Sequence, residues 1–315
     1  MKDKPLVSIL SPCYNVEMLL PQCLDSIVNQ TYTNLQIVLI DDGSKDNTWR
    51  VLQDYASRDS RIEIYHQDNQ GVAVTRNRLL EKVKGDWVLF VDADDWIESD
   101  MVETLLSLAI KREADIVECK NAINDSQCNK ENFEISQWPQ EEAVFQFLRH
   151  IDFGGSLWNK LIKTNLLDKE RFPDNVFYGE DALFCWHVLQ KINTIVRTSA
   201  QYYHYRMNDS SISHQKYDDK RMSGHLVWKQ ISQETKVLWP QYKNIADATY
   251  AISDMWQLYY AAKSKYPKDK NIKEYQSHVR SSLWLIYKSR LINAKKILFA
   301  IGVSISYRLG GVFVK

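Results

Sequence analysis

Short apolar runs alternate with segments of helical periodicity along the first hundred residues. Four of these runs are rich in β-branched and aromatic residues, which is typical of strands. They cover residues 6–10, 35–40, 62–65 and 87–91. Between them, apolar residues recur at three- and four-residue intervals, the spacing of helices. This alternation predicts an α/β fold with a Rossmann-like, mainly parallel sheet flanked by helices.

The rest of the chain changes character twice. A helix is predicted over 101–112 and a strand over 116–119, whereas 121–138 is polar, lacks periodicity and predicts a loop or a variable insertion. From about Lys216 onward, Tyr and Trp recur at helical spacing. We therefore predict a helical C-terminal region. The expected domains are 1–215, with halves of about 1–118 and 119–215, and 216–315.

Polar residues follow three of the predicted strands at the point where each strand ends. These segments are Ser11–Asn15, Asp41–Ser44 and Asp92–Asp95. Ligands of open parallel sheets bind beyond the carboxyl ends of the strands, so these segments are expected to meet at one edge. Five carboxylates would then lie close together, and their repulsion would be costly without a cation or hydrogen-bond donors.

The triplet Asp92-Ala93-Asp94 places two carboxylates directly after a strand. Hard divalent ions such as Mg²⁺ and Mn²⁺ prefer oxygen ligands and also bind phosphate oxygens. The alternative is that Asp94 or Asp95 only caps a turn. The segment after the second strand has a similar alternative, a turn that leads into a helix capped by Asp46.

The segment Asp68–Asn77 contains a glycine turn followed by a helix start that carries Arg76. An arginine in this position can contact a nucleotide or a diphosphate. The alternative is a surface ion pair.

Four motifs in order resemble glycosyltransferase family 2, the inverting enzymes with the GT-A fold. The resemblance covers roughly residues 5–215 and includes relatives that build bacterial surface polysaccharides. The matching segments are Ser8–Asn15, Asp41–Thr48, Gln67–Asn77 and Val91–Asp95. The resemblance implies that the first half of residues 1–215 binds a UDP-sugar donor and that the second half binds the acceptor.

The resemblance also implies roles for individual residues. Pro12, Tyr14 and Asn15 would line the nucleotide pocket, and Asp42 would accept a hydrogen bond from the uracil ring. Two further groups would contact the rest of the donor. Arg76 would reach the base or the diphosphate, and Asp92 would face the ribose and join Asp94 in binding Mn²⁺ or Mg²⁺.

The catalytic base is expected in the second half, where Gly179-Glu180-Asp181 precedes an apolar helix over 182–189. By resemblance, Asp181 would deprotonate the acceptor hydroxyl, and Glu180 would position the acceptor or support Asp181. The alternative is that both acids only favour a helix N-terminus electrostatically.

Two later segments match the family less specifically. Trp158, Asn159 and Lys160 would lie near the acceptor, with a buried tryptophan beside a helix as the alternative. The segment 202–213 resembles one that folds over the diphosphate. His204 or His214 would complete the metal shell, although a lone histidine is more often structural.

Composition gives evidence on the binding partners and the cellular compartment of the protein. Lys+Arg and Asp+Glu both total 40, so no global charge imbalance points to nucleic acid. The five cysteines form no Cys-x-x-Cys pair, which fits reduced thiols in the cytoplasm. The apolar run before Pro12 is too short for a signal-peptide core, so secretion is not expected.

Charge is segregated at the C-terminus. No acidic residue follows Glu274, while seven Lys and Arg residues do, and 297–314 is largely apolar but interrupted by Arg308, glycines and serines. This stretch makes a poor membrane span. A basic, apolar tail can lie in the interface plane at the inner face of the membrane, where a lipid-linked acceptor would be found. The alternative is a helix that packs on the catalytic domain or on a second copy in a homo-oligomer.

The expected reaction is a single in-line displacement with inversion, in which UDP leaves as an anion. Two alternatives use part of the same evidence. A nucleotidyltransferase also combines a parallel sheet with carboxylates, but no early Gly-rich basic loop for a triphosphate is present. A non-catalytic sugar-nucleotide binding scaffold would not need both Asp94 and Asp181.

Overall fold

The computed structural model describes residues 4–124, 126–131, 133–149, 153–207 and 217–311. The chain forms two compact units. The first unit consists of residues 1–143, 156–173 and 187–207, and the second consists of residues 144–155, 174–186 and 208–315. The second unit therefore contains, besides the C-terminal helices, the segment that carries Glu180 and Asp181.

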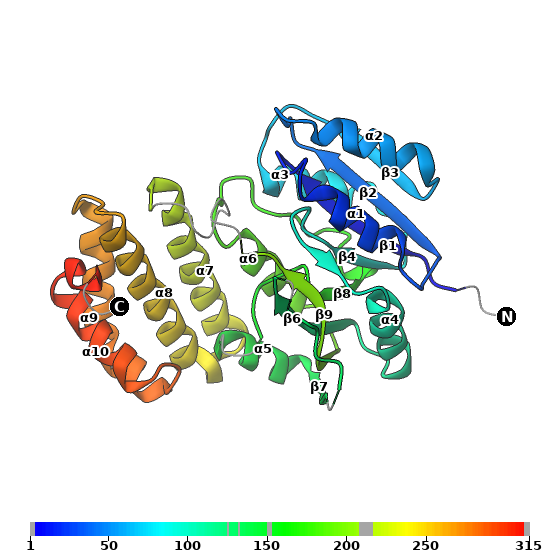
Figure 1. The fold of residues 1–315 in the computed structure, drawn as a ribbon. Helices are drawn as coiled ribbons and strands as arrows, with labels where there is room; N and C mark the ends of the chain where they lie inside the picture. The colour runs from blue at the N-terminus through cyan, green and yellow to red at the C-terminus, as the bar shows by residue number, and fades with distance from the viewer. Residues whose placement is uncertain (1–3, 125, 132, 150–152, 208–216, 312–315) are drawn as a thin grey trace. The chain divides into compact units, whose positions relative to one another are not determined.

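Nine strands form one sheet among the described residues of the first unit (Figure 1), in the order β3-β2-β1-β4-β8-β6-β9-β5, with β7 paired to β9. Strands β3, β2, β1 and β4 are parallel, whereas β8 runs antiparallel to both β4 and β6. The strands are β1 (Val7–Cys13), β2 (Leu35–Asp41), β3 (Ile62–His66), β4 (Trp87–Phe90), β5 (Trp96–Ile97), β6 (Ile116–Ile123), β7 (Ile135–Pro139), β8 (Lys160–Lys163) and β9 (Thr194–Tyr205).

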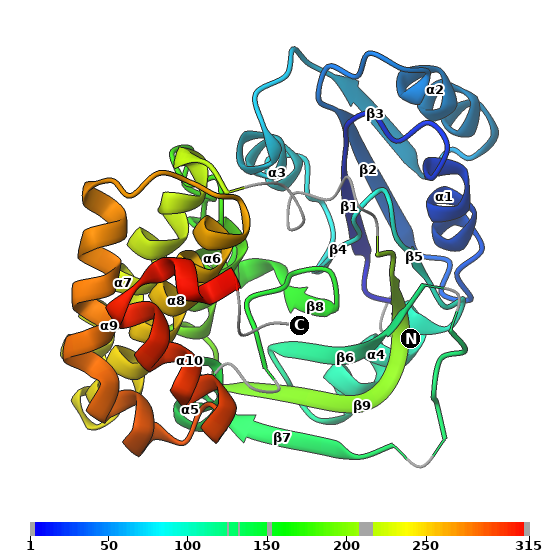
Figure 2. The same cartoon turned by 60° about the vertical axis from the view of Figure 1, so that its left-hand side comes forward.

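Helices cover both faces of the parallel part of the sheet. Val7 and Ile9 of β1 pack with the apolar faces of the helices on one side, and Leu10 points to the opposite side because strand side chains alternate. In Figure 2, α1 and α2 lie along one face of β1–β3 and α3 along the other. The helices of this unit are α1 (Leu20–Val28), α2 (Thr48–Arg58), α3 (Val72–Leu80) and α4 (Met101–Lys111), with the short η1 (Thr164–Leu166). The predicted α/β fold with a sheet between helices is confirmed.

The predicted loop over 121–138 is wrong at both of its ends. Strand β6 continues to Ile123, and β7 pairs antiparallel with β9, with Ser136 opposite Arg197. No residue of β7 is buried, so the strand forms through backbone pairing at a sheet edge and not through a buried apolar face. An edge strand of this kind leaves no hydrophobic signal in the sequence.

The second unit is helical, as predicted for the C-terminal region. In Figure 1, α7, α8, α9 and α10 lie side by side, and Met255, Leu258, Val279 and Phe299 are buried in their shared core. Helices α5 and α6 each have residues in both units. The bounds are α5 (Gln140–Arg149), α6 (Glu180–Leu189), α7 (Ser223–Leu238), α8 (Lys243–Lys263), α9 (Lys270–Ser289) and α10 (Ala294–Ile305), with η3 (Asp219–Met222), η4 (Pro240–Tyr242) and η5 (Tyr307–Gly311). None of the described helices has the length and apolar character needed to cross a bilayer.

Candidate active site

The carboxyl ends of β1, β2 and β4 lie at one edge of the sheet, because the three strands are parallel neighbours. The N–H of Asp42 donates to the carbonyl of Cys13 at 2.8 Å, and the N–H of Val91 donates to the carbonyl of Leu10 at 3.0 Å. The loops that follow these strands therefore start side by side. They carry the polar segments that the sequence predicted to meet.

Asp42 is buried and organises the loop that precedes α3. Its Oδ1 accepts hydrogen bonds from Gln67 Nε2 at 2.7 Å and from the N–H of Gln70 at 2.9 Å, and its Oδ2 accepts from the N–H of Gly71 at 2.9 Å. The following Gly43 has φ of +71°, a conformation that glycine adopts without a steric cost. Asp42 thus shapes the wall of the site, and its contact with uracil stays a prediction.

The segment Pro12–Asn15 is tied to the loop after β2. The N–H of Asn15 donates to Ser44 Oγ at 2.9 Å, and Asn15 Oδ1 accepts from the N–H of Lys45 at 2.8 Å. The ring of Tyr14 is 47% exposed, which leaves an aromatic surface on which a base can stack. The pocket-lining roles of Pro12, Tyr14 and Asn15 stay predictions.

The aspartates after β4 sit in a partly buried, negatively charged environment. Burial and then the charge of Asp92 raise the pKa of Asp94 to about 6. Burial, together with the charges of Asp92 and Asp94, also raises the pKa of Asp95 well above its ordinary value. Because the donors are hard carboxylate oxygens that repel one another, Asp92 and Asp94 fit a Mg²⁺ or Mn²⁺ ion. Asp95 is only 2% exposed, so we interpret it as a structural residue of this loop and not as a metal ligand.

Arg76 points from α3 to the same aspartates. Its side chain is buried, its NH2 group lies 3.3 Å from Asp92 Oδ1, and its guanidinium lies 5.6 Å from the centre of the Phe172 ring. The alternative of a surface ion pair does not hold for this residue. A buried arginine next to a carboxylate pair is a positive charge of the kind that a diphosphate needs, and the contact of Arg76 with the base or the diphosphate stays a prediction.

Arg206 and Tyr203 hold the aspartate loop, and sequence reasoning assigned a site role to neither. Arg206 Nε donates to the carbonyl of Asp94 at 2.8 Å, and its N–H donates to Asp95 Oδ1 at 2.8 Å. The guanidinium also lies 4.5 Å from the centre of the Trp96 ring. Both residues lie in the segment 202–213, whose sequence resembles a segment of the family. Their contacts with the aspartate loop depend on the pairing of β5 with β9, which no local sequence pattern indicates.

Glu180 and Asp181 begin α6 in the second unit. Gly179 before them has φ of +86°, which favours glycine and directs the chain into the helix. Glu180 is buried and Asp181 is partly exposed, and Asp181 Oδ1 accepts from the N–H of Ala182 at 2.8 Å. Their roles as catalytic base and supporting acid stay predictions, as does the alternative role at the helix N-terminus.

Trp158, Asn159 and Lys160 have structural contacts within the first unit. The Trp158 ring stacks on Tyr203 with 4.5 Å between ring centres. Asn159 Nδ2 donates to the carbonyl of Cys119 at 2.8 Å. Lys160 is 1% exposed, and the acceptor roles of these three residues stay predictions.

His204 contacts residues other than Asp92 and Asp94, the predicted metal ligands. Its Nε2 lies 2.8 Å from Glu98 Oε1 and 3.4 Å from Cys128 Sγ, and its Nδ1 lies 3.2 Å from the carbonyl of Asn124. Both ring nitrogens are thus occupied by groups other than Asp92 and Asp94. His214 lies outside the described residues, as do Ser210–Ser213.

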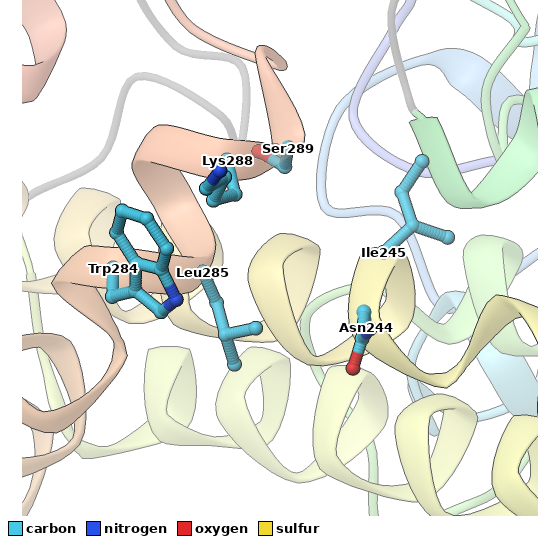
Figure 3. Close-up of a pocket in the computed structure, with 6 residues that line it drawn as sticks. All are labelled: Asn244, Ile245, Trp284, Leu285, Lys288 and Ser289. Carbon is cyan, nitrogen blue, oxygen red and sulfur yellow. The ribbon is translucent and has the colours of Figure 1, made fainter.

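A groove in the second unit lies between α8 and α9 (Figure 3) and has a volume of about 460 Å³. None of the described residues that line it carries a carboxylate, so this lining does not offer the metal-binding and base chemistry of the predicted site. The lining residues are Asn244, Ile245, Trp284, Leu285, Lys288 and Ser289.

The sheet and the polar edge described above define an α/β protein with a candidate ligand site at the carboxyl ends of its parallel strands. Comparison with known sequences narrows this class to one family. The chain belongs to glycosyl transferase family 2, whose model matches residues 8–173. The resemblance given by the four motifs is therefore confirmed.

A relative agrees with this assignment, and two solved structures share the fold. EpsH of Bacillus subtilis (strain 168) is 33% identical over 233 residues, which cover 71% of this chain and 67% of EpsH. S. aureus TarS 1-349 in complex with UDP-GlcNAc has a TM-score of 0.70 at 18% identity, covering 96% of this chain and 89% of TarS. The mannosyltransferase PcManGT from Pyrobaculum calidifontis, in complex with GDP-Man and Mn²⁺, has a TM-score of 0.59 at 16% identity, covering 97% of this chain and 88% of PcManGT. These two structures share the fold with this chain, and the predicted fold class is confirmed.

Proposed function

We propose that this protein is an inverting, metal-dependent glycosyltransferase that transfers a sugar from a UDP-sugar to an acceptor hydroxyl. The observation that carries the proposal is the pairing of buried Arg76 with Asp92 at 3.3 Å, directly beside Asp94 at the carboxyl edge of the sheet. In this proposal, Arg76 is a fixed positive charge next to the proposed divalent-ion ligands Asp92 and Asp94. A leaving diphosphate requires positive charge of this kind.

The donor site is assembled from the three loops at the sheet edge. Tyr14 offers its exposed ring to the base, Asn15 and Pro12 line the pocket, and Asp42 holds the Gln67–Gly71 loop and accepts from uracil. Asp92 faces the ribose. The UDP-GlcNAc bound to TarS supports a UDP-sugar as the first donor to test, and the Mn²⁺ bound to PcManGT supports a divalent metal.

The reaction is one displacement at the anomeric carbon. Asp181 takes the proton of the acceptor hydroxyl while the acceptor oxygen forms a bond to that carbon, and the bond to the diphosphate oxygen breaks. Glu180 supports Asp181 or positions the acceptor. Asp94 and Asp92 would hold a divalent ion, which would supply charge stabilisation for the departing UDP, and Arg76 adds a second positive charge.

The acceptor is proposed to be a lipid-linked or oligosaccharide intermediate of surface polysaccharide synthesis, used at the inner, cytoplasmic face of the cell membrane. Support comes from α10, where Leu298, Ile301 and Ile305 are exposed on one side of the helix. Lys295 and Lys296 at the start of α10 are exposed as well. An exposed apolar stripe next to cations suits an anionic lipid surface.

The test compares UDP release by the wild-type protein, Asp94→Ala and Asp181→Asn with Mn²⁺ and a set of UDP-sugars. Turnover should be lost in both variants, and Asp54→Asn, which changes an exposed carboxylate on α2, should keep it. Binding of a UDP-sugar without turnover by the wild type would support the non-catalytic scaffold. Pyrophosphate release from a nucleoside triphosphate would support the nucleotidyltransferase.

A further inference from the structure

Three side chains from separate parts of the first unit meet beside β9, and the proposed transfer reaction uses none of them. Glu98 directly follows β5, His204 lies in β9, and Cys128 lies between β6 and β7. One ligand atom from each residue lies within 4.8 Å of the other two. His204 Nε2 is central, at 2.8 Å from Glu98 Oε1 and 3.4 Å from Cys128 Sγ.

The donor set differs in kind from the carboxylates after β4. Sulfur, imidazole nitrogen and a carboxylate oxygen are the ligands that Zn²⁺ accepts in proteins, whereas Mg²⁺ and Mn²⁺ prefer oxygen. A cluster with these three donors therefore selects a softer ion than the pair Asp92 and Asp94 does.

The surroundings of His204 orient its imidazole toward the cluster. The carbonyl of Asn124 lies 3.2 Å from Nδ1, so this nitrogen carries the N–H and Nε2 faces Glu98 and Cys128. The Trp96 ring stacks on the imidazole with 4.6 Å between centres and an interplanar angle of 10°. A carbonyl on the outer nitrogen and a fixed ring plane are the usual support of a metal-binding histidine.

Lys130 also contacts Glu98, through the carboxylate oxygen that does not face His204. Its Nζ lies 2.8 Å from Glu98 Oε2 and also contacts Asp100. Oε1 stays directed at His204. The ammonium fixes the carboxylate, and its positive charge lowers the affinity for any cation bound nearby.

We propose that Glu98, Cys128 and His204 bind one Zn²⁺ ion, with water as the fourth ligand. Binding releases two protons, one from the Cys128 thiol and one shared between His204 Nε2 and Glu98 Oε1, so the charge of the ion is balanced. The ion would link the segment around Cys128 to β9. Because Arg206 lies two residues beyond His204 and bonds to Asp94 and Asp95, the site would stabilise the strand that holds the aspartate loop.

Cobalt(II) spectroscopy tests the proposal on the full-length protein. One equivalent of Co²⁺ should produce a thiolate-to-cobalt charge-transfer band with tetrahedral d–d bands, and Zn²⁺ should displace it. Cys128→Ser should abolish the charge-transfer band and weaken Zn²⁺ binding about tenfold or more. Asp94→Ala should leave the band unchanged, which separates this site from the donor metal site. A wild-type protein without the band, or a Cys128→Ser protein that keeps it, overturns the proposal.

Two further measurements do not depend on removing a ligand. All five cysteines lie among the described residues, and Cys128 is half-buried whereas Cys13, Cys23, Cys119 and Cys185 are buried. Zn²⁺ should therefore slow alkylation of Cys128 by iodoacetamide, whereas Mg²⁺ should not. Lys130→Met should tighten Zn²⁺ binding, because it removes the nearby positive charge. Equal alkylation rates with and without Zn²⁺ contradict the proposal.

Discussion

The hydroxyl of Tyr203 donates a hydrogen bond of 2.7 Å to Asp95 Oδ2. The same hydroxyl accepts one of 3.2 Å from the N–H of Asp92. One side chain of β9 therefore holds both ends of the aspartate loop, from a position more than a hundred residues further along the chain. The placement of Asp94 between these two anchors depends on β9 as much as on β4, the strand that precedes the motif.

Tyr203→Phe removes both hydrogen bonds while it keeps the ring. It should lower the free energy of unfolding by about 1 to 3 kcal/mol, because two buried polar groups lose their partner. It should also lower kcat/KM about tenfold, since small displacements of aligned groups are costly. Denaturant unfolding and UDP release measure these effects.

The control Tyr65→Phe removes a hydroxyl from a partly exposed side chain with a 3.3 Å contact and should change stability by less than about 0.5 kcal/mol. Equal effects of the two variants would contradict the anchoring role of Tyr203.

Gly43→Ala tests the loop that Asp42 holds. A Cβ at Gly43 would lie 2.7 Å from the backbone nitrogen of Asn69, and the φ of +71° is unfavourable for alanine. The clash should displace the Gln67–Gly71 loop and raise the Kd for UDP about tenfold, as measured by calorimetry. Gly85→Ala creates a similar clash, with its Cβ 2.7 Å from the nitrogen of Ser8, but at the amino-terminal end of β4. It should lower stability and leave the Kd for UDP unchanged, and a similar rise in Kd for both variants would argue against a local effect.

The strands and the polar edge of the first unit could be predicted because their signals are local. Buried parallel strands read as continuous apolar runs, and their order places the following residues at one edge. The contacts made by Tyr203 and Arg206 could not be predicted, since they depend on the antiparallel pairing that sets Trp96 opposite His204. The loop-building role of Asp42 was also missed, because its partners are mainly backbone N–H groups that any residue could supply.

Lys160, which the sequence suggested as an acceptor contact, makes buried contacts whose effect on stability can be tested. Lys160 Nζ donates to the carbonyl of Ser156 at 2.6 Å and lies 3.4 Å from Glu118 Oε1. Lys160→Met keeps the length of the side chain but leaves the buried carboxylate with less positive charge. Because Arg197 Nε remains 2.6 Å from Glu118 Oε2, the free energy of unfolding should fall by about 1.5 to 3 kcal/mol, while the KM for the acceptor stays unchanged.

Lys163→Met on the same strand is the matched control. Its partner is Asp115 at 2.9 Å, but the lysine side chain is 38% exposed, so the loss should be about 1 kcal/mol or less. Chemical denaturation of both variants measures the difference. A raised KM for the acceptor without loss of stability in Lys160→Met would restore the acceptor role.

The exposed stripe of α10 gives a test of membrane attachment that does not require truncation. Removing α10 would also remove Phe299 and Val303 from the core of the second unit, so point changes are more informative. Leu298 is 61% exposed and Ile305 is 66% exposed. Leu298→Glu should lower partitioning onto vesicles that contain phosphatidylglycerol about tenfold, because burial of such a side chain contributes about 1.5 to 3 kcal/mol.

Two kinds of variant are the controls for this prediction: one removes positive charge from α10, and the other changes an exposed apolar residue on a different helix. Lys295→Gln with Lys296→Gln should weaken partitioning most at low salt, since each cation near an anionic surface contributes about 1 kcal/mol. Leu226→Glu changes an apolar side chain of α7 with 58% exposure and should leave partitioning unchanged. Unchanged partitioning of Leu298→Glu, together with a smaller hydrodynamic size than the wild type, would assign the stripe to contact with a second copy of the chain instead of lipid.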